Sequence, residues 1–111
     1  MTEDQKLQAL TIIRNILAGK IDPERISIVR RVAYHSVVYD GYAARPLCRF
    51  YQRGHTYTFS IHDERKVELC WTIDQIAEIN LFKNQLINRH VCMRVAIAIA
   101  EMRKTGKKIK L

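Results

Sequence analysis

The sequence predicts an α+β domain, in which a four-stranded antiparallel meander is flanked by an N-terminal helix and a long C-terminal helix. Three observations lead to this prediction. An apolar stripe of helical spacing opens the chain, alternation of apolar and polar residues fills its middle, and a second helical pattern follows without Gly or Pro. With 111 residues, 48% of them hydrophobic, the chain can bury one core.

The first helix is predicted to begin at Thr2. Residues 2–5, Thr-Glu-Asp-Gln, have the capping-box form, and two acidic residues lie where the helix dipole favours them. Leu7, Leu10, Ile13 and Leu17 form one apolar stripe, which ends before a glycine at position 19. Residues 22–25, Asp-Pro-Glu-Arg, then predict a turn or a single helical turn.

Four strands are expected next, over residues 30–39, 45–51, 55–62 and 67–73, separated by turn-forming residues. The turns are Asp40-Gly41, Gln52-Arg53-Gly54 and Asp63-Glu64-Arg65. The alternation predicts that one face of the sheet is apolar, and its inward side chains are Phe50, Tyr57, Phe59, Leu69 and Trp71.

The second helix is predicted to start at the capping-box pattern of residues 72–75, Thr-Ile-Asp-Gln, and to run to about Lys104. Its first half offers an apolar stripe to the sheet. Residues 91–100 are apolar nearly all round, so either the first helix or a partner chain must cover them. The expected organisation is one domain over residues 1–104 and a basic tail over residues 105–111.

The charge is strongly basic and unevenly placed. The formal net charge is +8, and residues 103–111 hold five cations and no anion. Such a distribution favours phosphate-bearing or acidic partners.

No apolar run is long enough to span a bilayer and the N-terminus lacks the basic region of a secretory signal, so we expect a cytoplasmic protein that does not bind membranes. Cys48, Cys70 and Cys92 suit neither a disulfide framework nor a metal site, and reduced thiols are expected.

The chain carries no complete catalytic motif. Asp40 with Glu64-Arg65-Lys66 has the residue types of a two-carboxylate, one-lysine metal nuclease. A solvated hairpin turn is favoured instead, because these residues lie in predicted turns rather than in the middle of a strand. The His and Cys spacings also disfavour zinc, so neither a metal nor another cofactor is predicted.

The second face of the meander is predicted to be basic with aromatic members. A face of this kind can hold a nucleic-acid backbone by charge and stack bases on rings, although an ordinary solvated sheet face is the alternative. The tail offers further cations, either as an arm for phosphates or as a solubilising terminus. The predicted nucleic-acid-binding residues are Arg31, Arg45, Arg49, Tyr51 and Lys66 on the sheet, where His35 and Thr58 are also expected to point outward, and Lys104, Lys107, Lys108 and Lys110 in the tail.

Several segments together carry a family resemblance: residues 24–34, the strand 46–51 (Pro-Leu-Cys-Arg-Phe-Tyr), the hairpin strand 57–61 and the helix start 73–76. Over residues 8–87 the chain resembles the small C-terminal region of bacterial proteins related to the N-terminal part of type I restriction enzyme R subunits. The nuclease motif of that family belongs to a separate upstream domain with no counterpart here. The resemblance therefore implies a module that accompanies DNA cleavage or defence, and it supplies no catalytic residue.

Two functions follow as hypotheses from these observations. The first is a noncatalytic nucleic-acid-binding or accessory module, linked to DNA processing or defence, with DNA or RNA as its partner. The second is a protein-interaction module, either a homodimer or an inhibitor subunit, that uses the apolar helix through Val91, Val95, Ile97 and Ile99.

Overall fold

The computed structural model describes residues 1–41, 46–62, 65 and 67–91. Helix α1 spans Glu3–Leu17 and begins with the predicted capping box, in which Thr2 Oγ1 accepts a hydrogen bond from Gln5 N and Gln5 Oε1 accepts one from Thr2 N. The helix ends before Gly19, whose φ of 81° lies in the left-handed region. The single turn η1, Pro23–Arg25, is capped by Asp22 as predicted.

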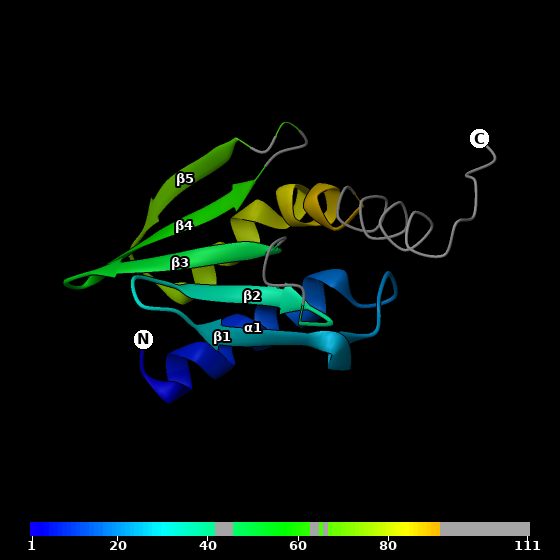
Figure 1. The fold of residues 1–111 in the computed structure, drawn as a ribbon, viewed down its shortest axis with the longest axis horizontal. Helices are drawn as coiled ribbons and strands as arrows, with labels where there is room; N and C mark the ends of the chain where they lie inside the picture. Colours follow the sequence, from blue (N-terminus) through cyan, green and yellow to red (C-terminus); the bar gives the residue numbers. More distant parts are fainter. Residues whose placement is uncertain (42–45, 63–64, 66, 92–111) are drawn as a thin grey trace.

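Five antiparallel strands follow in the order β1-β2-β3-β4-β5, so the sheet is a simple meander (Figure 1). Strands β1 and β2 span Ile26–Arg30 and His35–Tyr39, and β3 spans Cys48–Arg53. Strands β4 and β5 span Thr56–His62 and Glu68–Ile73. The turns between β1 and β2 and between β3 and β4 lie at the same end of the sheet, at the left of Figure 1.

The prediction of four strands was wrong, because the single strand expected over residues 30–39 is a hairpin. Arg30 pairs with His35, and residues 31–34 form the turn, in which Arg31 N donates to Tyr34 O at 2.7 Å. This turn contains no Gly, Pro, Asn or Asp, the residues that usually mark a turn in a sequence. Strand β1 was therefore missed.

The second helical region starts later than predicted. Strand β5 continues through Ile73, and the 3₁₀ segment η2, Ile76–Phe82, follows. Its cap is a box between Gln75 and Glu78: Glu78 Oε2 accepts hydrogen bonds from Asp74 N at 2.6 Å and Gln75 N at 2.8 Å. Residues 83–91 are α-helical, and the predicted continuation to Lys104 lies outside the described residues.

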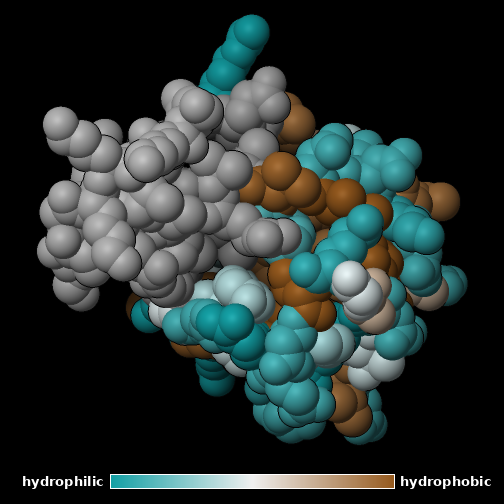
Figure 2. All heavy atoms as spheres, turned by 90° about the vertical axis from the view of Figure 1, so that its right-hand side faces the viewer, coloured by the Kyte–Doolittle hydropathy of each residue, from teal (hydrophilic) through white to brown (hydrophobic). Residues whose placement is uncertain are grey.

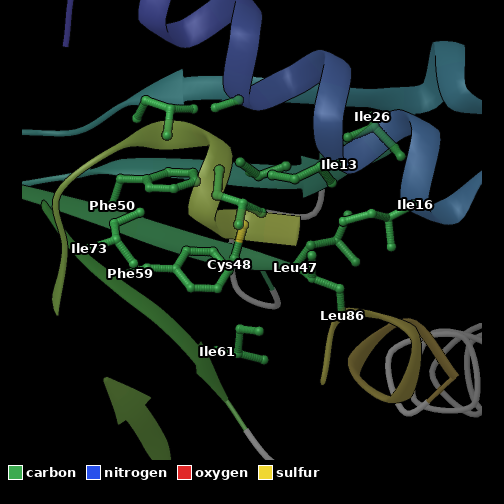
Figure 3. Close-up of a cluster of buried hydrophobic side chains, with 14 of the residues drawn as sticks. Ile13, Ile16, Ile26, Leu47, Cys48, Phe50, Phe59, Ile61, Ile73 and Leu86 are labelled. Atoms are coloured by element: carbon green, nitrogen blue, oxygen red, sulfur yellow. The ribbon is translucent and has the colours of Figure 1, made fainter. Parts of the chain in front are cut away.

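The helical elements cover one face of the sheet. Helix α1, η2 and Leu86 of the following helix contribute to a single buried cluster with alternate residues of the strands. Figure 3 shows Phe50 and Phe59 of the sheet in the same layer as Ile13 of α1 and Leu86. Within the described ranges, the helical elements therefore lie on the same face of the sheet and do not flank it from opposite sides. Alternation in β3 and β4 directs their large apolar side chains to this face, whereas Val38 of β2 is buried on the opposite face.

Candidate functional site

Strand β3 directs Arg49, Tyr51 and Arg53 to the face of the sheet that points away from the helices, because its other residues, Cys48 and Phe50, belong to the core. Tyr34, in the β1–β2 turn, joins them. Its ring centroid lies 5.3 Å from that of Tyr51, and the guanidinium carbon of Arg49 lies 4.7 Å from the Tyr34 centroid. We call Tyr34, Arg49 and Tyr51 the tyrosine–arginine cluster.

A carboxylate from β5 adjoins this cluster. Glu68 Oε1 accepts hydrogen bonds from Tyr51 Oη at 2.8 Å and from Ser60 Oγ at 2.7 Å. The sheet register explains why residues of three strands meet here. Ser60 of β4 pairs with Arg49 of β3 and with Cys70 of β5, so these three residues lie on the outer face. Three strands and one turn thus build a single polar and aromatic site.

The ionisation of the two hydrogen-bonded groups reflects these contacts. Burial raises the pKa of Glu68, but the hydrogen bonds from Ser60 and Tyr51, helped by His62 and Arg49, outweigh it and leave the pKa below its usual value. The pKa of Tyr51 is raised, first by burial and then by its bond to Glu68. The site therefore pairs an ionised carboxylate with a neutral phenol at neutral pH.

The outer face is closed along β2 and at Ser60 of β4, which is buried, and it is more open at Tyr51, Thr58 and along β5. Ser36 and Val38, which point outward from β2, are buried, with exposed fractions of 2% and 0%. By contrast, Cys70 and Thr72 on β5 are exposed, and Tyr51 and Thr58 are half-buried. A shallow hollow of about 290 Å³ lies in this open part, lined by Tyr51, Arg53, Thr58, Glu68 and Cys70.

The structure brings together some of the predicted binding residues. Arg49 and Tyr51 meet through Tyr34, and Arg31 is exposed in the turn that carries Tyr34. The other predicted residues lie outside the described part of the chain: Arg45 and Lys66, and Lys104, Lys107, Lys108 and Lys110 in the tail.

The outward position expected for His35 is wrong. This residue pairs with Phe50 and therefore lies on the helix-facing side of the sheet. Its pKa is lowered, first by burial and then by the nearby N-terminus, Lys6 and Arg30. The β1–β2 turn, which was not predicted, explains why His35 was assigned to the wrong face, because this turn sets the register of β2.

Two members of the site were not singled out from the sequence. Tyr34 was expected to continue a strand, so its position in a turn above β3 could not be foreseen. Glu68 alternates with Val67 and Leu69, which places it on the outer face, and this was the signal that could have identified it. Identifying Tyr51 and Ser60 as its hydrogen-bond partners would have required the register of β3, β4 and β5.

The nuclease-like fragment is not assembled among the described residues. Asp40 forms a salt bridge with Arg25. Arg25 Nε donates a hydrogen bond to Asp40 Oδ1 at 2.6 Å, and Arg25 Nη2 contacts Asp40 Oδ2. Glu64 and Lys66 lie outside the described residues. Within the described ranges, no three His, Cys, Asp or Glu side chains are grouped so that they could hold a metal ion.

The described thiols are not activated as nucleophiles. Cys48 is 1% exposed in the core, and burial raises the pKa of its thiol. The pKa of the exposed Cys70 is also raised, first by burial and then by Glu68. A reactive cysteine needs a lowered pKa, so neither residue suits nucleophilic catalysis.

A second hollow, of about 360 Å³, lies where the first turns of α1 meet the β3–β4 turn and residues 74–77. Four glutamine side chains contribute to its lining, together with His55 and the carboxylate of Asp74. Amides and a carboxylate do not make a cationic surface, so this hollow does not favour phosphate.

Apolar side chains are exposed near the end of the described chain. Leu81 and Val91 are 74% and 53% exposed. Figure 2 shows apolar surface on the side of the molecule that lies at the right of Figure 1. Of the predicted interaction residues, only Val91 is described; Val95, Ile97 and Ile99 lie beyond it. No helix within the described ranges is both long enough and apolar enough to cross a membrane.

Comparison with known proteins identified no relative of this chain. No protein-family model, curated protein or solved structure matches the chain. The resemblance to proteins related to type I restriction enzyme R subunits therefore stays a prediction.

Proposed function

We propose that this chain is a noncatalytic nucleic-acid-binding module that holds single strands on the outer face of its sheet, in a setting of DNA processing or defence. The observation that carries the proposal is the tyrosine–arginine cluster on the outer face of β3, which lies on the same side of the sheet as the exposed Cys70 and Thr72 of β5. Single-strand binders combine cations for the backbone with aromatic rings for the bases, and a sheet face is a common platform for both.

The overall charge supports the same function. The chain carries a formal charge of +8, which attracts polyanions from a distance. Arg49 and Arg53 supply cations beside the tyrosine rings, Arg31 is exposed in the turn that carries Tyr34, and Glu68 is the acidic group of the site. A backbone would therefore follow the arginines, while bases would be directed toward Tyr51 and Glu68.

Fluorescence anisotropy with a labelled thymidine oligonucleotide of about 12 nucleotides tests the proposal. Tyr51→Ala is expected to weaken binding by about five- to 150-fold, since stacking is worth about 1 to 3 kcal/mol per base. Tyr51→Phe keeps the ring and is expected to bind nearly as wild type. Arg49→Ala is compared with Lys20→Ala, which removes the same charge from the exposed segment after α1.

The proposal fails if the wild-type protein shows no binding tighter than about 100 µM at roughly 50 mM salt, which is weaker than ordinary nonspecific affinity. The second candidate would then take its place. This is a protein-interaction module built on apolar surface, which the exposure of Leu81 and Val91 favours. Its direct test is the mass of the protein in solution, which would exceed that of a 13.0 kDa monomer if the chain forms a homodimer.

A further inference from the structure

The hollow beside Tyr51 has the size and lining of a site for one base. Its volume of about 290 Å³ lies at the lower limit of small-molecule sites, which favours a single ring system over a larger ligand. Tyr51 contributes an aromatic wall, Arg53 a cation and Glu68 a carboxylate. The cation can reach a phosphate next to a bound base, but the carboxylate repels phosphate, so it must face another part of the ligand.

Considering only the described residues, one oxygen of Glu68 keeps its capacity to accept hydrogen bonds. A carboxylate offers about four acceptor positions, and Tyr51 and Ser60 both donate to the same oxygen, Oε1. Neither bond involves Oε2. Because the two bonds also fix the orientation of the carboxylate, the remaining acceptors are preorganised, and a ligand edge rich in N–H donors is the complement that they require.

We infer that this hollow selects guanine among the bases of a bound single strand, with Tyr51 as the stacking surface and Glu68 as the acceptor for the N1–H and N2–H donors. The inference rests on the proposed function and adds a base preference to it. Guanine presents two adjacent donors on its Watson–Crick edge. Adenine and cytosine present an amino group beside a ring acceptor, and thymine presents one N–H between two carbonyl oxygens, so each of them places an acceptor against the carboxylate.

Single-base replacement in the thymidine oligonucleotide tests this assignment with the wild-type protein. One central guanine, whose two donors would share the remaining oxygen Oε2, is expected to tighten binding by about tenfold or more relative to thymidine alone, the order expected for a hydrogen bond to a charged group. Inosine lacks the 2-amino group and is expected to lose most of this gain. 7-Deazaguanine keeps both donors and changes only the opposite edge of the base, so it is the matched control and is expected to bind as guanine does.

Two carboxylate variants then assign the preference to Glu68. Glu68→Gln is expected to reduce the guanine preference to about twofold or less, while its affinity for the thymidine oligonucleotide is unchanged or higher because a negative charge is removed. That retained binding also shows that the variant is folded. Glu24→Gln removes a charge from an exposed position in η1 and is expected to keep the full preference.

The outcomes separate the two proposals. Equal affinity for the guanine and thymidine oligonucleotides would overturn the guanine site and leave single-strand binding intact. A guanine preference that survives in Glu68→Gln would also overturn it. Failure to bind either oligonucleotide would overturn the proposed function itself.

Discussion

Trp71 lies on the helix-facing side of the edge strand β5, where it is half-buried. Its ring centroid is 4.6 Å from that of Phe82 and 6.2 Å from that of Phe59. Complete burial makes a Trp→Ala or Phe→Ala change cost about 3 to 5 kcal/mol. Because part of the Trp71 ring stays in water, Trp71→Ala is expected to cost about 2 kcal/mol, whereas Phe59→Ala, at a fully buried position, is expected to reach the full range. Urea denaturation of both variants measures the difference, and a loss below about 1 kcal/mol for Trp71→Ala would contradict the packing of β5.

Glu68 links the ionisation of the site to its hydrogen bonds. Since its pKa is lowered in the folded chain, the stabilisation that it provides is present above the ordinary value of 4.5 and is lost as the pH falls through the folded value. Tyr51→Phe removes one of the two donors, so the pKa of Glu68 is expected to rise toward its ordinary value while the Ser60 bond remains. Carbon NMR titration of the carboxyl group measures this. Tyr34→Phe keeps both donors and serves as the control, and equal pKa values in wild type and Tyr51→Phe would contradict the contact.

At the scale of the elements, Glu78 joins the end of β5 to η2. One carboxylate oxygen accepts two backbone N–H groups, those of Asp74 and Gln75, that the 3₁₀ segment itself leaves without partners. Glu78→Ala is expected to destabilise the fold by about 1 kcal/mol, the usual cost of losing a cap. Glu78→Gln keeps an acceptor oxygen and is expected to cost less. Thermal or chemical unfolding compares the two, and equal losses would count against the capping role.

Sequence patterns located most elements but not their packing. The capping box at Thr2, the alternation of residues 55–62 and the turn at Gly54 were all predicted correctly, because each depends on neighbours within a few residues. The β1–β2 turn was missed, since it carries no turn residue and its Val32 is fully exposed despite being apolar. Exposure of the Val32 side chain to water is unfavourable. The pairing of β1 with β2 and the packing of β1 against the core offset this cost, and only the tertiary structure reveals that balance.

The candidate site shows the same division between local and long-range information. Alternation along β3 was enough to place Arg49 and Tyr51 together on one face. The contacts of Tyr34 with Arg49 and of Glu68 with Tyr51 join residues that are 15 and 17 positions apart. The first contact depends on the β1–β2 turn, which was missed, and the second on the register of β3, β4 and β5, which alternation alone does not determine.

For the whole molecule, the main consequence of the fold is its asymmetry. Helix α1, η2 and the following helix share one core with one face of the sheet, while arginine and tyrosine side chains lie on the other. The hydrogen-bonded strands hold these side chains in place, and the proposed binding site would use them as a rigid platform. Part of the proposed electrostatic attraction is separable from stacking, because the tail lysines are distant in sequence from the tyrosine–arginine cluster.

That separation predicts two distinct responses to salt. Removing residues 104–111 deletes four lysines, so if the tail contacts phosphates, affinity is expected to fall alike for all single strands. The slope of log affinity against log salt is expected to shrink by about 0.7 for each lost contact. Replacing the same four lysines with glutamine keeps the length and is expected to give the same slope as the deletion. Tyr51→Ala is expected to weaken binding with the slope nearly intact, because stacking releases few counterions. Salt titrations of anisotropy on these four proteins, wild type included, measure both quantities. An unchanged slope after removal of the tail would show that the cations of the folded domain carry the electrostatic contact by themselves.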